Sequence, residues 1–244
     1  MDFALNEEQR MFRSMFRDFA ANEIEPQAEE IDHEETLPPA MLRKAANQGF
    51  LGATLPEDYF GAELDGVSYA MLIEAVASAC MSMAVVMIHH VSAVAESILA
   101  YGTEAQKEEW LMAMAAGEAV GAFALTEPDA GTDAASLQTQ AVVDGDDVVL
   151  NGVKSWVTNG KIAGLFLVFA RGPEGIDAYL VPADAPGLTV GYREPTLGLR
   201  SATFSTVYLE DCRVAADNRL GAPGQGWEIA RQASDRVAIG LAAA

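Results

Sequence analysis

The sequence is poor in cysteine and in basic residues. Its two cysteines, Cys80 and Cys212, lie far apart and lack the spacing of metal ligands, so we expect neither a disulfide framework nor a metal site. Against 36 Asp and Glu there are 15 Lys and Arg, and the formal net charge of -21 disfavours nucleic acid as a partner. Half of the 244 residues are apolar, which is enough for a sizeable core and predicts a globular protein.

Long apolar runs and targeting signals are also missing. The most apolar run, "AVASACMSMAVVMI" at residues 75–88, is shorter than the ~20 residues that a membrane span needs, and it predicts a buried helix. The first ten residues, "MDFALNEEQR", lack the basic start and apolar stretch of a secretory signal. We therefore expect a cytoplasmic protein without a membrane span.

The first half of the chain carries the signals of helices. Asn6 with Gln9, and Thr103 with Gln106, have the spacing of capping boxes that open helices at residues 7 and 104. A further helix is predicted from the prolines at 38–39 to Gly49, and the proline-free stretch 66–102 predicts one long helix or two in series. We expect four or five helices and no strand between residues 6 and 117.

After residue 117 the apolar period changes from 3.6 to 2. Short β-rich runs occur at residues 137–143, 147–151, 153–158, 164–170, 177–182, 187–192 and 205–211, and turn residues separate them. Asn151-Gly152 and Asn159-Gly160 are strong turn signals, and the first predicts a two-residue hairpin. This pattern is typical of a β-sandwich or barrel.

The last twenty residues return to helical spacing. Their apolar positions share one helix face, and no C-terminal cap follows, so we expect this helix to continue or to be covered: Trp227, Ala230, Ser234, Val237 and Leu241. The predicted fold is α+β and multi-domain. It has an all-α domain at residues 1–118, a β-sandwich or barrel domain at 119–224, and the first helix of a truncated C-terminal helical domain at 225–244.

One segment, "ALTEPDAGTDAASLQT" at residues 124–139, interrupts the regular pattern. Pro128-Asp129 is a natural turn centre, and Gly131 permits positive φ or close approach by a ligand. Thr132 is predicted to cap a short helical turn, whose outward amides would form an anion cradle. Because Asp129 and Asp133 would repel a phosphate, an ordinary helix-to-strand connection fits these residues about as well.

This segment resembles the flavin-binding signature of the acyl-CoA dehydrogenase family, A-L-T-E-P-x-A-G-S-D. Other segments resemble the family in the same order: "GTEAQKEEWL", "NGVKSWVTNG", "LGLRSATFSTVYLEDCRV" and "NRLGAPGQGW". The resemblance extends from Asn6 over nearly the whole chain. It implies a helical N-terminal domain, a middle β domain, and FAD as the cofactor.

The resemblance also implies residue roles. Residues at the positions of Phe123, Leu125 and Thr126 line the flavin ring, and those of Gly131 and Thr132 contact the pyrophosphate and the bound thioester. Trp156, Val157 and Thr158 fall where the family covers one ring face and hydrogen-bonds near N5, while Arg236 matches an arginine near the CoA and catalytic region. Thr132 stands where serine is commoner, and Ala233 where many members carry Asp.

The implied reaction is α,β-dehydrogenation of an acyl-CoA thioester, as in fatty acid β-oxidation. In the family a glutamate removes the α proton while hydride passes to flavin N5, and an electron-transferring flavoprotein accepts the electrons. The resemblance places that glutamate in the C-terminal domain, so we expect no catalytic base in this chain; Glu127 supports its loop instead. A homo-tetramer or a heteromer with a related subunit is implied.

Other possibilities stay open at this point. The chain could be a non-catalytic or half-site subunit that completes an FAD site with a partner chain, or a related flavin enzyme such as an acyl-CoA oxidase or flavin monooxygenase. His89 and His90 are adjacent and point about a hundred degrees apart on a helix, so they do not readily share a metal. His90 and Ser92 match an H-x-S segment near the acyl pocket of some relatives, although a buried structural histidine is the commoner case.

Overall fold

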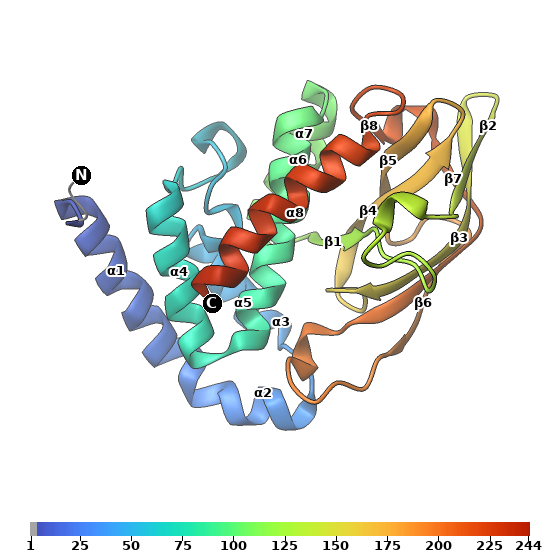
Figure 1. The fold of residues 1–244 in the computed structure, drawn as a ribbon. Helices are drawn as coiled ribbons and strands as arrows, with labels where there is room; N and C mark the ends of the chain where they lie inside the picture. Colours follow the sequence, from blue (N-terminus) through green and yellow to red (C-terminus); the bar gives the residue numbers. More distant parts are fainter. Residues whose placement is uncertain (1–3) are drawn as a thin grey trace.

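The computed structural model describes residues 4–244, and it consists of a helical half followed by a sheet (Figure 1). Its α-helices are α1 Glu7–Phe19, α2 Ala28–Glu34, α3 Pro39–Asn47, α4 Gly66–Ala79, α5 Met81–Ile88, α6 Glu96–Tyr101, α7 Glu104–Ala115 and α8 Gly226–Ala243. Its strands are β1 Val120–Ala124, β2 Gln140–Asp144, β3 Asp147–Val157, β4 Ala163–Gly172, β5 Gly175–Pro182, β6 Leu188–Arg193, β7 Ser205–Ala215 and β8 Arg219–Leu220. The predicted order, helices and then a β region ending in a helix, is confirmed.

Both predicted capping boxes are formed. The Asn6 side chain accepts a hydrogen bond from the Gln9 amide at 2.7 Å, and the Gln9 side chain accepts one from the Asn6 amide at 3.1 Å. Thr103 and Gln106 make the same reciprocal pair at the start of α7. These local bonds satisfy amides that have no partner within the helix, which is why the sequence located both helix starts.

The long apolar stretch forms two helices in series. Cys80 has an extended backbone with φ -153° and separates α4 from the next helix. That helix combines α5, a π-helical turn His89–Ala95 (η5) and α6 into the 21 residues Met81–Tyr101, with a mean hydropathy of 1.6. Among the described residues it alone is long and apolar enough to span a membrane, but 78% of its most apolar window is buried within the protein, as in the core helix of a globular fold.

The β region is one eight-stranded sheet in the order β6-β7-β3-β2-β4-β5-β8, with β1 paired to β4. The two-residue hairpin predicted at Asn151-Gly152 is wrong, because β3 runs through these residues with a register shift against β7. A Cβ at Gly152 would lie 2.3 Å from the Thr139 hydroxyl, so close packing accounts for this glycine. The Asn159-Gly160 turn is present between β3 and β4, whereas β1 and β8 had no predicted counterpart.

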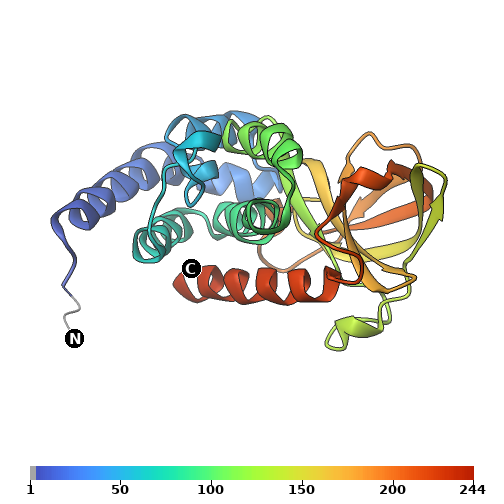
Figure 2. The same cartoon turned by 90° about the horizontal axis from the view of Figure 1, so that it is seen from above.

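Strand β4 is buried on both faces and joins the two halves. Its residues Leu165, Leu167 and Phe169 pack in a cluster with α7 and α8. The alternate residues Phe166 and Val168 pack in a second cluster that includes residues of β3, β5 and β7, so the sheet curls around its own core. Helix α8 contacts α4, η5 and β5, and Figure 2 shows it lying beside the helical half with its N-terminal end at the sheet. This position makes α8 one wall of a cleft.

Candidate functional site

A cleft of about 500 Å³ lies between the ends of two strands and helix α8. Its β side comes from β1, the loop that follows β1, and the end of β3, and its helical side comes from α8 with one residue of η5. The lining residues are His89, Phe123, Leu125, Thr126, Gly131, Thr132, Ala134, Trp156, Thr158, Trp227, Ala230, Arg231, Ser234, Asp235, Val237, Ala238 and Leu241. A mainly apolar cleft with a few hydroxyls and charges, in this size range, is typical of a cofactor or small-molecule site.

The structure brings together most of the residues that the sequence singled out. The predicted cofactor residues line this one cleft, with the exception of Val157: Phe123, Leu125, Thr126, Gly131, Thr132, Trp156 and Thr158. Val157 is 1% exposed and packs in the core of the curled sheet, because neighbouring residues on a strand face opposite sides. The segments 123–132 and 156–158 therefore meet, as the proposed site requires.

Trp156 is held in an unusual conformation at the cleft. Its φ of 57° lies in the left-handed region, and its side chain is 56% exposed. The indole contacts the Phe204 ring edge-on, with 6.5 Å between the ring centroids. A strained backbone and a large exposed aromatic ring are expected at a site that binds a flat ligand rather than in a core.

The loop after β1 is folded tightly and presents its small residues to the cleft. Glu127 and Ala130 exchange backbone hydrogen bonds at 3.0 and 3.2 Å, which confirms the turn at Pro128-Asp129. The predicted cap at Thr132 is wrong: the short 3₁₀ turn begins at Ala134, and no side chain caps it. A three-residue turn presents too few free amides for an anion cradle, although Thr132 itself lines the cleft.

Comparison with known proteins decides the family. The family model described as "Acyl-CoA dehydrogenase, N-terminal domain" matches residues 6–118, and the one described as "Acyl-CoA dehydrogenase, middle domain" matches residues 122–212. The chain belongs to the acyl-CoA dehydrogenase family. The second match covers the β1 loop and the end of β3, so it includes the whole β side of the cleft.

Relatives agree with this assignment. The short-chain specific acyl-CoA dehydrogenase of Clostridium acetobutylicum is 39% identical over 248 aligned residues, which cover 100% of this chain and 65% of that protein. A solved chain described as electron transferring flavoprotein of Acidaminococcus fermentans has 38% identity and a TM-score of 0.96. The match covers 100% of this chain and 65% of that chain. A glutaryl-CoA dehydrogenase from Mycobacterium smegmatis in complex with FADH2 has 33% identity and a TM-score of 0.94. The match covers 98% of this chain and 61% of that chain. The chain thus spans about two thirds of these relatives.

In this chain, the apolar face predicted for the last helix is the helical wall of the cleft. Trp227, Ala230, Ser234, Val237 and Leu241 all line it. The helical period had identified this face, but no sequence pattern indicated that it shares a cleft with Trp156. Arg231 and Asp235 also line the cleft and were missed, because charged residues on one helix look like solvent-exposed residues until the partner surface is known.

His89 adds a polar group at the helical side of the cleft. Its Nδ1 lies 3.0 Å from the Val85 carbonyl oxygen, so Nδ1 carries the proton and Nε2 is left as an acceptor. Burial lowers the pKa of His89, which favours the neutral ring. The adjacent His90 points elsewhere: it is 1% exposed, and its Nδ1 accepts a hydrogen bond from the Gly121 amide at 3.0 Å.

Arg236, predicted to bind substrate, lies outside the cleft lining. Its Nε is 3.2 Å from Glu96 Oε2 of helix α6, and its Nη2 is 3.5 Å from the Gln232 side chain. One buried guanidinium nitrogen, Nη1, has no hydrogen-bond partner. A substrate role for Arg236 stays a prediction. Ser92 donates its hydroxyl hydrogen bond to Tyr69 at 3.0 Å within the helical core.

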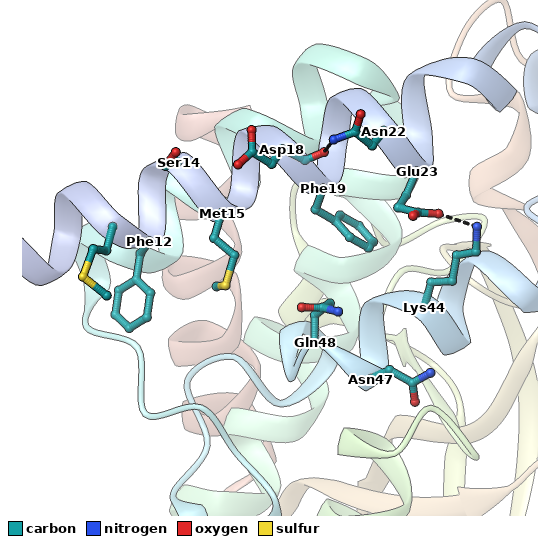
Figure 3. A pocket seen from close by; sticks show the side chains of 11 residues that line it. Phe12, Ser14, Met15, Asp18, Phe19, Asn22, Glu23, Lys44, Asn47 and Gln48 are labelled. Atoms are coloured by element: carbon teal, nitrogen blue, oxygen red, sulfur yellow. Dashed lines mark hydrogen bonds and ion pairs between the residues drawn. The ribbon is translucent and has the colours of Figure 1, made fainter.

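A second hollow, of about 710 Å³, lies on the far side of the helical half between α1 and α3 (Figure 3). Met15 and Phe19 point into it, and the Glu23–Lys44 ion pair lies at one end. Its polar lining consists of three amides, the Ser14 hydroxyl, the Asp18 carboxylate and the Glu23–Lys44 pair, and none of the site residues predicted from the sequence lies there. The cleft beside α8 is therefore the candidate functional site.

Proposed function

We propose that this protein is an FAD-dependent acyl-CoA dehydrogenase that carries out α,β-dehydrogenation of an acyl-CoA thioester. The observation that carries the proposal is the meeting of the β1 loop, Trp156 and α8 in one cleft. The solved relative bound to FADH2 and the short-chain specific relative support the cofactor and the substrate class. Acyl length is left open by the cleft itself.

The cleft residues fit a flavin ring. Trp156 offers an exposed flat surface, and the hydroxyls of Thr126, Thr132 and Thr158 are short hydrogen-bonding groups suited to the polar edge of the ring. A Cβ built on Gly131 meets no atom within 4 Å, so this part of the loop leaves open space for a bound group. When bound, FAD supplies the electron acceptor for the oxidation of the acyl chain.

The residues of this chain have binding and orienting roles in the proposal. The β1 loop and Trp156 hold the ring from the sheet side, and the apolar face of α8 excludes water from the opposite side. Orientation of ring and thioester in one cleft can lower the barrier by several kcal/mol. That no residue here acts as the catalytic base stays a prediction, and so does the electron-transferring flavoprotein as acceptor.

The alternatives are less well supported. The matched relatives give no support to a half-site subunit, and native mass spectrometry tests it, since a co-purifying related chain is required. An oxidase or monooxygenase would consume oxygen during turnover, which an oxygen electrode detects. Homo-oligomerisation and a cytoplasmic location are further parts of the proposal that need direct measurement.

Titration with FAD tests the proposal. The protein, produced as its gene encodes it and freed of flavin, is titrated while flavin fluorescence is followed. Saturable binding is expected, with weaker binding by Trp156→Ala and unchanged binding by Tyr192→Ala, a matched aromatic that is 94% exposed on β6 outside the cleft. Addition of butyryl-, octanoyl- or palmitoyl-CoA should then bleach the visible flavin absorbance. Absence of FAD binding by the wild type would refute the proposal.

A further inference from the structure

A buried ion pair lies directly behind the cleft. The side chain of Lys154 on β3 is 0% exposed and that of Glu127 is 6% exposed, and 2.7 Å separate Lys154 Nζ from Glu127 Oε1. Lys154 Nζ also donates a hydrogen bond to the Leu125 carbonyl oxygen at 3.1 Å. Neither Lys154 nor Glu127 lines the cleft itself, so neither has a direct role in binding there.

Glu127 closes the loop that follows β1. Its Oε2 accepts a hydrogen bond from the Gln138 amide at 2.6 Å, and its Oε1 accepts one from the Thr139 amide at 2.9 Å. The Thr139 hydroxyl donates to Oε1 as well. Both ends of the segment 127–139 are thus joined at one carboxylate, and this segment carries Gly131 and Thr132 into the cleft.

Lys154 connects this closed loop to the strand that carries Trp156. The next residue, Ser155, donates its amide hydrogen bond to the Thr126 carbonyl oxygen at 2.8 Å. Through these bonds β3 holds the chain at residues 125, 126 and 127. The cleft's three β-side segments, at 125–126, 131–134 and 156–158, all attach to the pair directly or through neighbouring residues.

Stability alone does not account for such a pair. Removing two charges from water costs several kcal/mol per ion, and replacing a buried pair with apolar residues of similar volume is often neutral or stabilising. Burial lowers the pKa of Lys154 to about 8, which shows the cost of keeping the ammonium here. The ion pair instead fixes the geometry between the β1 loop and β3, because charge-assisted bonds are short and directional.

We propose that Lys154 and Glu127 are positioning residues for the flavin ring, whose ion pair sets the relative positions of the β1 loop and the Trp156 strand. The inference rests on the proposed function, because it names the residues that shape the same site. A purely structural role predicts that flavin binding returns when stability is restored without the ion pair. The positioning role predicts that flavin binding does not return.

The test is a double-mutant cycle with Lys154→Met, Glu127→Gln and the combined variant, in the protein as its gene encodes it. The free energy of unfolding is measured in urea without flavin, and the FAD Kd and visible spectrum are measured where every variant is folded. Each single change leaves a buried group without its partner, so we expect both to be destabilised. The combined variant leaves neither charge unpaired, so it should recover part of that stability, while the amide nitrogen introduced by Glu127→Gln cannot accept the Gln138 hydrogen bond.

The combined variant decides the inference. Its FAD Kd should stay at least about tenfold weaker than that of the wild type, because a loop that is in the binding arrangement about a tenth of the time weakens the apparent Kd by that factor, and its visible flavin spectrum should be altered. Wild-type affinity and spectrum in the combined variant would overturn the inference. A loss of FAD affinity that is proportional to the loss of stability across the wild type and the three variants would also overturn it.

A matched control and a flavin-free readout complete the experiment. Arg200→Met removes ion pairs to Asp32 and Glu35 outside the cleft, so it should lower stability and leave the FAD Kd unchanged. In flavin-free protein, amide exchange across residues 126–139 should be faster in the combined variant than in the wild type. Unchanged exchange overturns the positioning role of Lys154 and Glu127 even if the wild type binds no FAD. Absence of FAD binding by the wild type would count separately against the proposed function.

A milder change covers the case in which the combined variant does not fold. Thr139→Val removes only the hydroxyl bond to Glu127 Oε1 and leaves the ion pair in place. We expect amide exchange to be accelerated less than in the combined variant and FAD to bind more weakly than in the wild type. The free energy of unfolding should stay close to that of the wild type. Unchanged exchange and unchanged Kd in this variant would contradict the proposed role of the carboxylate.

Discussion

Trp156→Gly separates the binding role of the indole from any structural role. The φ of 57° costs a residue with a Cβ about 1–2 kcal/mol, and glycine removes that cost. Two losses oppose the gain: glycine adds about 0.5–1 kcal/mol of chain entropy, and the aromatic contact with Phe204 is worth about 0.5–1.5 kcal/mol. Since the side chain is 56% exposed, these terms should leave the free energy of unfolding within about 1.5 kcal/mol of the wild type.

Flavin binding should respond differently. Stacking of a flat ring on an aromatic side chain is worth about 1–3 kcal/mol, which corresponds to an FAD Kd about 5- to 150-fold weaker in Trp156→Gly. Fluorescence titration gives the Kd, and urea unfolding of flavin-free protein gives the stability. Asn159→Gly is the control: its φ of 69° is also left-handed, but its side chain bonds to the Val86 and Gly121 carbonyls, so it should lose stability. An unchanged Kd in Trp156→Gly would refute the stacking role.

Other predictions follow from packing and burial. A Cβ at Gly61 would lie 1.8 Å from the Leu55 carbonyl oxygen, so Gly61→Ala should cost about 3 kcal/mol or more in urea unfolding, whereas Gly131→Ala, with open space, should cost less than about 0.5 kcal/mol. Phe169 is 0% exposed, and Phe169→Ala should lower the free energy of unfolding by about 3–5 kcal/mol. Burial lowers the pKa of His90 from 6.5 to about 4, so the unfolded state takes up the proton first. Stability should therefore fall as the pH drops from about 6.5 to about 4, and less so in His90→Asn.

Local signals in the sequence located much of the helical half. The capping boxes at Asn6 and Thr103 depend on residues three apart, so their helix starts could be predicted without tertiary structure. The hairpin turn predicted at Asn151-Gly152 was wrong, because Gly152 continues β3 and packs against Thr139 of a neighbouring segment. Strand β1 was missed because it is short and pairs in parallel with β4, a contact that no local pattern reveals.

The site was predictable on its β side and not on its helical side. A resemblance to a known signature identified Leu125, Thr132 and Trp156, and the structure places them in one cleft. Arg231 and Asp235 lie on α8 and were not predicted, since the surface that a helix face meets is not known until the fold is known. The role of Lys154 depended on burial and distances, which a lysine in an alternating strand does not show.

A crystal structure of the protein with FAD is the most direct test of the site. We predict the flavin ring between the β1 loop and the end of β3, against Trp156 and within hydrogen-bonding distance of Thr126 or Thr158, with α8 as the opposite wall of the cleft. A flavin ring bound elsewhere, such as in the hollow between α1 and α3, would contradict the account.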